Sequence, residues 1–335
     1  MPYLHFPPSW PLFTPKDKLA DWFEAYAQLM ELNIWMGTSV RSARFNEDAR
    51  HWTVQLRQPD GSFRTLKPKY FVLATGHSGE PHYPRFEGME MFGGTVYHTS
   101  QHQDAANFGD LTDKKVVVVG SGNSGHDIAQ DYHDKGADVT MLQRGATVVV
   151  SVDKGVMPTH QGMYDDDGPP LEDADIFTFS YPWPVKFTLD SVHTSFWRKE
   201  ESALLDGLTA AGFALHFGSG GEGLYKQYIT QGGGYYLDIG CSKLIADGKI
   251  KVKRDEGGVK GFSRDSVIMA SGEEIKADIV VLATGFDNMR TTARKLVGDK
   301  MADRLKDVWG LDEEGEMNAV SRQFFKSHAS EVIMN

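Results

Sequence analysis

The chain has 335 residues, 40% of them hydrophobic, so it is long enough to bury a substantial core and to form about two domains. Its formal net charge of −11 and its pI near 5.5 argue against a general binder of nucleic-acid backbones, because such proteins gather lysine and arginine on one surface. The single cysteine, Cys241, excludes an internal disulfide framework and a thiolate metal site, and it fits a reducing, cytoplasmic setting.

Neither a secretion signal nor a membrane span is evident. The first eight residues lack the basic region and apolar stretch of a signal peptide. No apolar run approaches the roughly 20 residues that a transmembrane helix needs. The sequence therefore predicts a soluble protein whose partners include neither a membrane nor a nucleic acid.

The first elements in chain order are a helix and a group of short strands. Thr14 and Pro15 predict a helix start, and apolar residues recur at helical spacing from Leu19 to Met30, so we expect their face to lie in the core. Strand-like runs follow at residues 39–45, 52–57 and 63–66. With the turn Pro59-Asp60-Gly61 between the last two, these runs predict a β-meander.

The phrase Ala-Thr-Gly occurs twice, each time after an apolar strand. Residues 70–73 predict a buried strand that leads into Ala74-Thr75-Gly76, and residues 278–282 lead into Ala283-Thr284-Gly285. The copies lie too far apart for a solenoid repeat, so they suggest one domain interrupted by another. The chain is expected to leave a sheet after the first copy and to rejoin it near Ala277. By itself each copy is only a strand and a small-residue loop, so its functional role stays open.

Between the two copies lies a glycine-spaced turn. Strand 116–119, made of four valines, runs into Gly120-Ser121-Gly122-Asn123-Ser124-Gly125 and then into a helix, and a second strand follows at 138–142. Gly120 allows the tight turn, Gly122 lets backbone N–H groups approach a pyrophosphate, and Gly125 lets the helix pack on the strand. The pattern predicts an α/β, Rossmann-like unit that binds a nicotinamide dinucleotide through residues 120–125.

The residues after the second strand indicate which dinucleotide. Gln143 and Arg144 stand roughly 20 residues beyond the glycines, where a chain that binds NAD usually presents Asp or Glu to the ribose. An arginine can instead bind a 2′-phosphate through a bidentate, charge-assisted contact, so the sequence favours NADP(H), with Gln143 and Arg144 as candidate contacts. The alternative is a glycine-rich turn of an α/β protein beside a merely solvated Arg144.

An ordered set of motifs spans nearly the whole chain. It comprises Trp10-Pro11 with the first helix, both Ala-Thr-Gly phrases, the signature Phe92-x-Gly94-x-x-x-His98 and the glycine turn. Together these motifs resemble the flavin-containing monooxygenases, which are class B flavoprotein monooxygenases related to the Baeyer–Villiger enzymes. The runs 232–240 and 244–250 resemble the later half of that family's NADP(H) domain. His102 stands where the family usually has an aromatic residue, which leaves the subfamily open.

The resemblance implies an α/β flavoprotein of the type with two dinucleotide-binding domains, in which a Rossmann-like NADP(H) domain is inserted in an FAD-binding domain. On this interpretation residues 1–79 form a partial FAD-binding domain and residues 80–274 form the NADP(H) domain, with an insertion around 152–217. Residues 275–335 return to the FAD-binding domain. The family's first G-x-G-x-x-G does not occur in residues 1–115, so the FAD-binding domain is expected to be truncated at both ends.

The resemblance also implies an activity, that of an NADPH- and FAD-dependent monooxygenase similar to N,N-dimethylaniline monooxygenase. In such enzymes NADPH reduces FAD, and the reduced flavin captures O₂ as a C4a-(hydro)peroxide that puts one oxygen atom into a small-molecule substrate. Because the cofactors carry the chemistry, few acid–base side chains are needed. N-oxygenation, S-oxygenation and ketone insertion stay open, as does the oligomeric state. The alternative is a flavin-free NADP(H)-binding module or an inactive fragment.

The family places its histidine signature near the nicotinamide, so the resemblance makes His98 the best candidate for site chemistry. A positional role near the cofactor is favoured over direct catalysis, and a hydrogen-bonded structural histidine is the alternative. Thr99 and Ser100 are candidate contacts to the phosphate or ribose of NADP. The remaining candidate contacts, in the vicinity of FAD or NADP, are Ala74, Thr75, Gly76, Thr284 and Gly285.

Other patterns carry weaker signals. The histidines have no metal-ligand spacing, and Asp165-Asp166-Asp167 indicates a solvated loop, so no metal site is predicted. The run 122–126 superficially resembles a nucleophile elbow, but His126 stands where that motif needs glycine. The aromatic-rich residues 152–217 are expected to cover the site or to shape substrate entry, with plain packing as the alternative.

Overall fold

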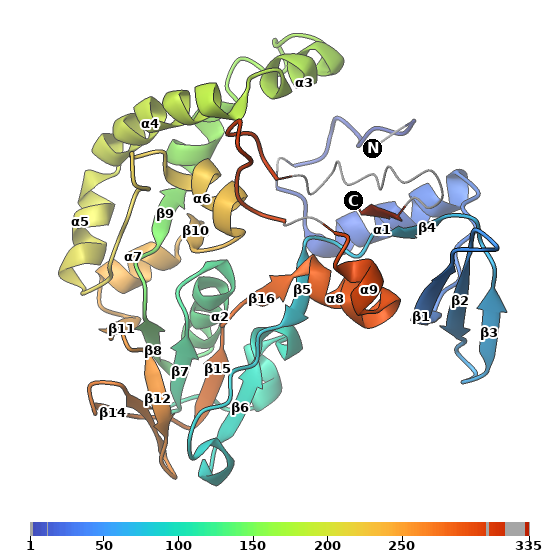
Figure 1. Cartoon of the computed structure of the whole chain (residues 1–335). Helices are drawn as coiled ribbons and strands as arrows, with labels where there is room; N and C mark the ends of the chain where they lie inside the picture. The colour runs from blue at the N-terminus through green and yellow to red at the C-terminus, as the bar shows by residue number, and fades with distance from the viewer. Residues whose placement is uncertain (1–2, 12, 306–307, 319–331, 335) are drawn as a thin grey trace.

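A five-stranded parallel sheet organises the larger part of the molecule in a computed structural model that describes residues 3–11, 13–305, 308–318 and 332–334 (Figure 1). Its order is β11-β8-β7-β15-β6. The strands are β6 (Thr95–His98), β7 (Lys115–Val119), β8 (Asp138–Gln143), β11 (Lys251–Arg254) and β15 (Ile279–Leu282). Because all the pairings are parallel, the carboxyl ends of the strands lie along one edge.

The central strands are buried on both faces, which explains their continuous runs of Val, Ile and Leu. On one face Val116 and Val118 pack with α2 (Asn123–Asp134) and α7 (Cys241–Ala246). On the other face Val117 and Val280 pack with a small antiparallel sheet. That sheet contains β12 (Val259–Phe262), β13 (Ser266–Met269) and β14 (Glu274–Lys276). The prediction of an α/β fold around the glycine turn is confirmed.

A second body holds the predicted β-meander. Its strands β1 (Ser39–Asn46), β2 (His51–Arg57) and β3 (Phe63–Leu66) pair in sequence order, so the meander is confirmed. Trp52 and Leu73 share a core there with Met289 and Ala293, which lie on α8 (Met289–Val297). The short helix α9 (Asp299–Ala302) packs beside α8.

The two Ala-Thr-Gly strands lie in different sheets. The first, β4 (Phe71–Leu73), pairs with β17 (Val332–Met334), whereas β15 lies between β7 and β6. The prediction that the chain rejoins its first sheet near Ala277 is therefore wrong. The physical reason is burial: β15 is apolar throughout and lies buried at the centre of the parallel sheet, whereas Val72 of β4 is 48% exposed.

The chain returns to the meander body through the strand that follows β15. After Gly285, β16 (Phe286–Asn288) pairs antiparallel with β5 (Ser78–Pro81) and leads directly into α8 of the meander body. These two short strands are thus the crossing point between the two bodies. The domain boundaries at 79/80 and 274/275 remain a prediction.

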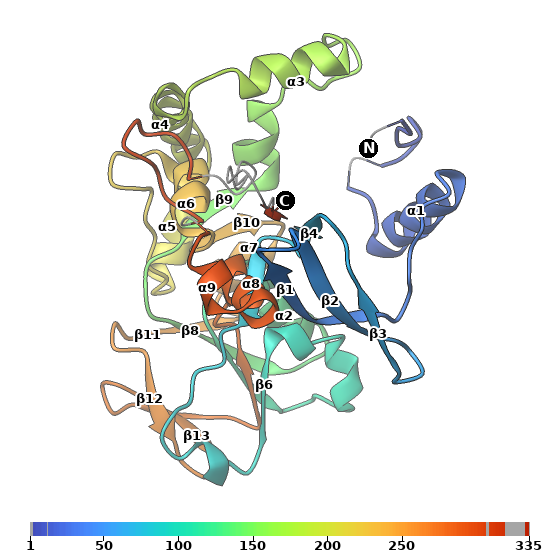
Figure 2. The ribbon, with the colours of Figure 1, turned by 45° about the vertical axis from the view of Figure 1, so that its right-hand side comes forward.

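The insertion is mainly helical. It contains η4 (Val152–Val156), η5 (Met157–Thr159), α3 (Leu171–Phe179), α4 (Trp183–Glu200) and α5 (Ser202–Ala210). Helix α6 (Gly223–Gln231) follows the insertion. Figures 1 and 2 show α4 to α6 on one side of the molecule and the β1–β3 meander on the other. Trp197 packs with β9 (Val148–Ser151), which pairs with β10 (Tyr235–Asp238), so packing accounts for that aromatic residue.

The first helix, α1 (Lys16–Leu29), differs in detail from the prediction. Pro15 is its N-cap, and no side chain, Thr14 included, caps it. Of its apolar residues only Trp22 is buried, in ring contact with Phe6 at 4.5 Å, whereas Phe23 of the predicted face is 46% exposed. The expectation of a core-facing helix is wrong for most of this face, because its contacts are local aromatic ones.

Three short 3₁₀ helices complete the described elements, η1 (Met89–Met91), η2 (Thr99–Gln101) and η3 (Ala105–Phe108). None of the described helices is both long enough and apolar enough to cross a lipid bilayer.

Gly94 of the signature before β6 provides a test of the fold. A Cβ there would lie 2.2 Å from the carbonyl oxygen of Asp278, so the backbone would have to move. We expect Gly94→Ala to lower the free energy of unfolding by about 1–3 kcal/mol in urea titrations. The control is Gly145→Ala, whose Cβ would have no neighbour within 4 Å. Equal unfolding midpoints for the two variants would contradict this packing.

Candidate functional site

The glycine turn at the end of β7 is shaped by close backbone contacts. Gly120 has φ +119°, and a Cβ there would lie 2.3 Å from the carbonyl oxygen of Ala283. A Cβ on Gly125 would lie 2.4 Å from the carbonyl oxygen of Gly120. The nearest atom to a Cβ on Gly122 is 3.8 Å away. The first and last glycines are thus required by the protein itself, whereas the middle one leaves space for a ligand to approach.

The side chains within the turn hold it in place. The Ser121 and Thr147 hydroxyl oxygens lie 2.8 Å apart, and Asn123 Oδ1 accepts a hydrogen bond of 2.8 Å from the backbone N–H of Leu237. Ser124 is exposed in the first turn of α2. Because the first N–H groups of a helix have no partner within it, the backbone supplies the donors for an anion here.

The turn opens into a cavity of about 810 Å³, a volume within the range of small-molecule sites. The cavity lies at the carboxyl ends of β7, β8 and β15, where the sheet order reverses and α/β sheets bind ligands. Besides residues 119–125, its wall includes 142–147, 232–235, 257–259 and 283–286.

Arg144 is exposed and lies at this cavity. Its side chain crosses Gly258, where a Cβ would come within 3.3 Å of Arg144 Cδ. Among the described residues no acidic side chain forms an ion pair with it, whereas Arg254 pairs with Glu256 at 2.7 Å. The guanidinium of Arg144 is therefore free to bind an anion.

The neighbouring Gln143 has a different environment. It is fully buried, and its side-chain amide exchanges hydrogen bonds of 2.7 and 2.9 Å with the backbone of Ala214. It also donates to Thr147 Oγ1 at 3.3 Å. These bonds hold the end of β8, and they occupy the side-chain amide of Gln143, which the sequence predicts as a coenzyme contact.

His98 lies at the end of β6 and is 1% exposed. Its Nδ1 accepts from the backbone N–H of Ser100 at 3.1 Å, so Nε2 carries the proton and donates to the carbonyl oxygen of Gly285 at 2.9 Å. Burial lowers the pKa of the imidazole. This neutral ring ties β6 to the loop after β15, an arrangement that favours the positional role. His98, Thr99 and Ser100 are not part of the cavity wall.

The two Ala-Thr-Gly loops are placed differently. Thr284 and Gly285 line the cavity, and Thr284 Oγ1 donates to the carbonyl oxygen of His82. Residues 74–76 are exposed and lie outside the wall, but the next two residues, His77 and Ser78, belong to it. The structure thus brings the second loop and the continuation of the first together with the glycine turn.

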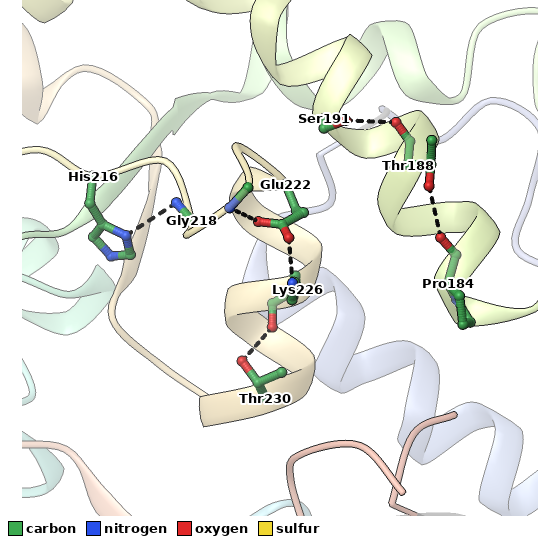
Figure 3. A network of polar contacts seen from close by, with 9 residues as sticks. Pro184, Thr188, Ser191, His216, Gly218, Glu222, Lys226 and Thr230 are labelled. Carbon is green, nitrogen blue, oxygen red and sulfur yellow. Dashed lines mark hydrogen bonds and ion pairs between the residues drawn. The ribbon is translucent and has the colours of Figure 1, made fainter. Parts of the chain in front are cut away.

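Several wall residues were not predicted, among them His216, Gln227 and Tyr235. Figure 3 shows His216 accepting from the backbone N–H of Gly218 at 3.3 Å, close to the ion pair between Glu222 and Lys226. The glycine-rich run 218–223 was the available signal, since it forms the tight loop that leads into α6.

His126 and Cys241 are structural. The His126 ring stacks on Tyr236 at 3.8 Å and donates through Nδ1 to the carbonyl oxygen of Gly122 at 3.0 Å. Burial lowers the pKa of His126 to about 4. Cys241 is fully buried, and burial raises the pKa of its thiol. Over the described part of the chain, no three His, Cys, Asp or Glu side chains gather to hold a metal.

The comparisons with known proteins agree with this geometry. The sequence model of the family described as pyridine nucleotide-disulphide oxidoreductase matches residues 11–161. The chain is 31% identical over 309 residues to indole-3-pyruvate monooxygenase YUCCA1 of Oryza sativa subsp. japonica, a match that covers 89% of this chain and 66% of that protein. Across the first curated relatives the chain spans 60% to 67% of their length.

Two solved structures share the fold. One is cyclohexanone monooxygenase with ε-caprolactone bound, at 17% identity and a TM-score of 0.59, where the match covers 84% of this chain and 60% of that one. The other is OTEMO in complex with FAD and NADP, at 16% identity and a TM-score of 0.60, where the match covers 86% and 60%. At these identities the likeness concerns the fold alone.

The buried His126 predicts a pH dependence of stability. The unfolded imidazole binds a proton near pH 6.5 but the folded one only near pH 4, so the unfolded state binds more protons between these values. The stabilisation is fully present above pH 6.5 and is lost as the pH falls towards 4. At roughly 1.4 kcal/mol per pKa unit, it amounts to about 3 kcal/mol.

The variant His126→Phe keeps a ring to stack on Tyr236 but cannot titrate. We expect its free energy of unfolding, measured by denaturant titration from pH 7 to 4, to lack this decrease. Asp190, whose pKa burial raises to about 6, contributes the opposite slope in both proteins and cancels in the difference. Parallel pH profiles for the two proteins would contradict the assignment.

Proposed function

Because this chain belongs to the class B flavoprotein monooxygenases, the group that includes the flavin-containing and Baeyer–Villiger enzymes, we propose that it binds NADP(H) and serves an NADPH- and FAD-dependent monooxygenase reaction. One observation carries the proposal: the glycine turn opens on a cavity of about 810 Å³ whose wall includes the unpaired Arg144. In the proposed reaction one atom of O₂ enters a small organic substrate.

The described residues fit NADP(H). The open side of Gly122 and the first turn of α2 would hold the pyrophosphate, and Arg144 would hold the 2′-phosphate of the adenosine ribose. Ser121, Asn123 and Gln143 would act by fixing the turn and the end of β8, because their side chains already bond to the protein.

The described residues fit FAD less completely. Thr284 and Gly285, with the exposed loop 74–76, are candidate contacts near both cofactors. Within the described ranges the glycine turn at 120–125 is the one strand–turn–helix of this spacing, and NADP(H) would occupy it. We therefore derive no step through FAD, which in this class supplies the transfer of electrons from NADPH to O₂.

The chain's own residues would bind, orient and exclude water. His98 would hold the loop at Gly285 next to the coenzyme, and its neutral ring donates a fixed hydrogen bond rather than moving a proton. Burial also lowers the pKa of His216, so this wall residue is neutral at physiological pH. The described residues that line the cavity include no aspartate or glutamate, which suits chemistry that the cofactors perform. We also propose that the protein acts in the cytoplasm, from its single buried cysteine.

A second candidate is a flavin-free NADP(H)-binding module, which is favoured because only one strand of the described residues runs through such a glycine turn into a helix. Incubating the purified chain with FAD and then measuring bound flavin and oxygen uptake distinguishes the two functions. The monooxygenase predicts retained flavin absorbance and NADPH-dependent oxygen uptake over a panel of amines, sulfides and ketones. Ketones belong in the panel because the name of one relative specifies a keto acid, indole-3-pyruvate, as substrate. Protein that stays colourless but binds NADPH would contradict the monooxygenase function and support the flavin-free module.

Replacing Arg144 tests the coenzyme assignment. We expect Arg144→Ala to weaken NADPH binding roughly 10- to 100-fold in calorimetric titrations and to leave NADH binding nearly unchanged, because only NADPH carries the 2′-phosphate. Arg57→Ala removes the same charge from an exposed position on β2 and should change neither affinity. Equal losses for both coenzymes in the Arg144 variant would contradict the assignment.

A further inference from the structure

Trp309 has a backbone conformation that a bulky side chain rarely adopts. Its φ is +66°, in the left-handed region, where a residue with a large side chain is an outlier that costs about 1–3 kcal/mol. Hydrogen bonds on both sides hold it there. The backbone N–H of Gly310 donates to the carbonyl oxygen of Ile229 at 2.9 Å, and Asn318 Nδ2 donates to the carbonyl oxygen of Trp309 at 3.3 Å. Such strain needs a structural reason.

The position of the indole ring suggests one. It meets Tyr228 of α6 edge-on at 5.5 Å and His77 at 5.9 Å, between ring centroids. A Cβ on Gly232 would lie 2.4 Å from the nearest atom of the indole. Gly232 must therefore be glycine for two reasons, its φ of +65° and the ring that lies against it.

The segment that the ring touches belongs to the coenzyme cavity. Residues 232–235 line it, and the buried Gln227 donates through Nε2 to the carbonyl oxygen of Gly233 at 2.9 Å. Gly234 has φ +78°, and its carbonyl oxygen accepts from the backbone N–H of Val148 at 3.1 Å. This wall, residues 232–234, is thus contacted by both Gln227 and Trp309.

Trp309 also packs against the core of the meander body, the cluster that contains Trp52 and Met289. One side chain thereby joins that body to the wall of the cavity. We propose that Trp309 is a positioning residue that, from outside the cavity, holds wall 232–234 in the conformation that binds the coenzyme. The inference rests on the proposed function and adds a device that sets coenzyme affinity from the second body.

The test is calorimetric titration of NADPH into Trp309→Phe and Trp309→Ala. A displaced wall should weaken binding by roughly 3- to 30-fold in the alanine variant and by less in the phenylalanine variant. The matched control is Trp52→Phe, a change in the same core at a fully buried residue that does not line the cavity. Its melting temperature should fall while its NADPH affinity stays unchanged.

A double substitution tests the contact itself. Gly232→Ala should weaken NADPH binding, because its Cβ meets the indole, and part of that loss should be recovered in the Trp309→Ala background, where the ring is absent. Additive losses, or an unchanged affinity in both Trp309 variants, would overturn the proposal. Failure of the unsubstituted chain to bind NADPH would refute the proposed function instead, so the two outcomes are distinguishable.

Discussion

The site depends on one backbone contact, the approach of the Ala283 carbonyl oxygen to Gly120. Strand β15 lies directly beside β7, and no side chain fits between the two strand ends. At Gly125, likewise, no side chain fits between α2 and the carbonyl oxygen of Gly120 in the turn. Because these contacts fix where the turn points, they also fix the open side of Gly122 and the direction of the first N–H groups of α2. The proposed coenzyme site therefore follows from packing that the fold itself needs.

Local patterns were sufficient for the parts of the molecule that depend on neighbouring residues. The glycine turn, the valine strand and the meander could be predicted because spacing and turn chemistry determine them. The sheet to which β15 belongs could not be predicted, because an apolar sequence shows that a strand is buried but not with which strands it pairs. The same limit applies to Gln143, whose position favoured a coenzyme contact although its amide bonds to Ala214, 71 residues away. Long-range partners of this kind are invisible in a single sequence.

The second body matters to the site through a few connections. The strand pair β5–β16 carries the chain between the bodies, and His98 ties β6 to Gly285 at the same crossing. Trp309 reaches the cavity wall from the meander core. The cavity wall therefore includes residues at the crossing point, such as His77, Ser78 and Phe286, as well as the glycine turn of the parallel sheet.

A crystal structure of the chain with NADP⁺ would test the proposed coenzyme site most directly. The proposed coenzyme site requires the pyrophosphate within hydrogen-bonding distance of the backbone N–H groups at residues 122–125 and the 2′-phosphate against the guanidinium of Arg144. A dinucleotide bound elsewhere, or bound with its 2′-phosphate away from Arg144, would contradict it.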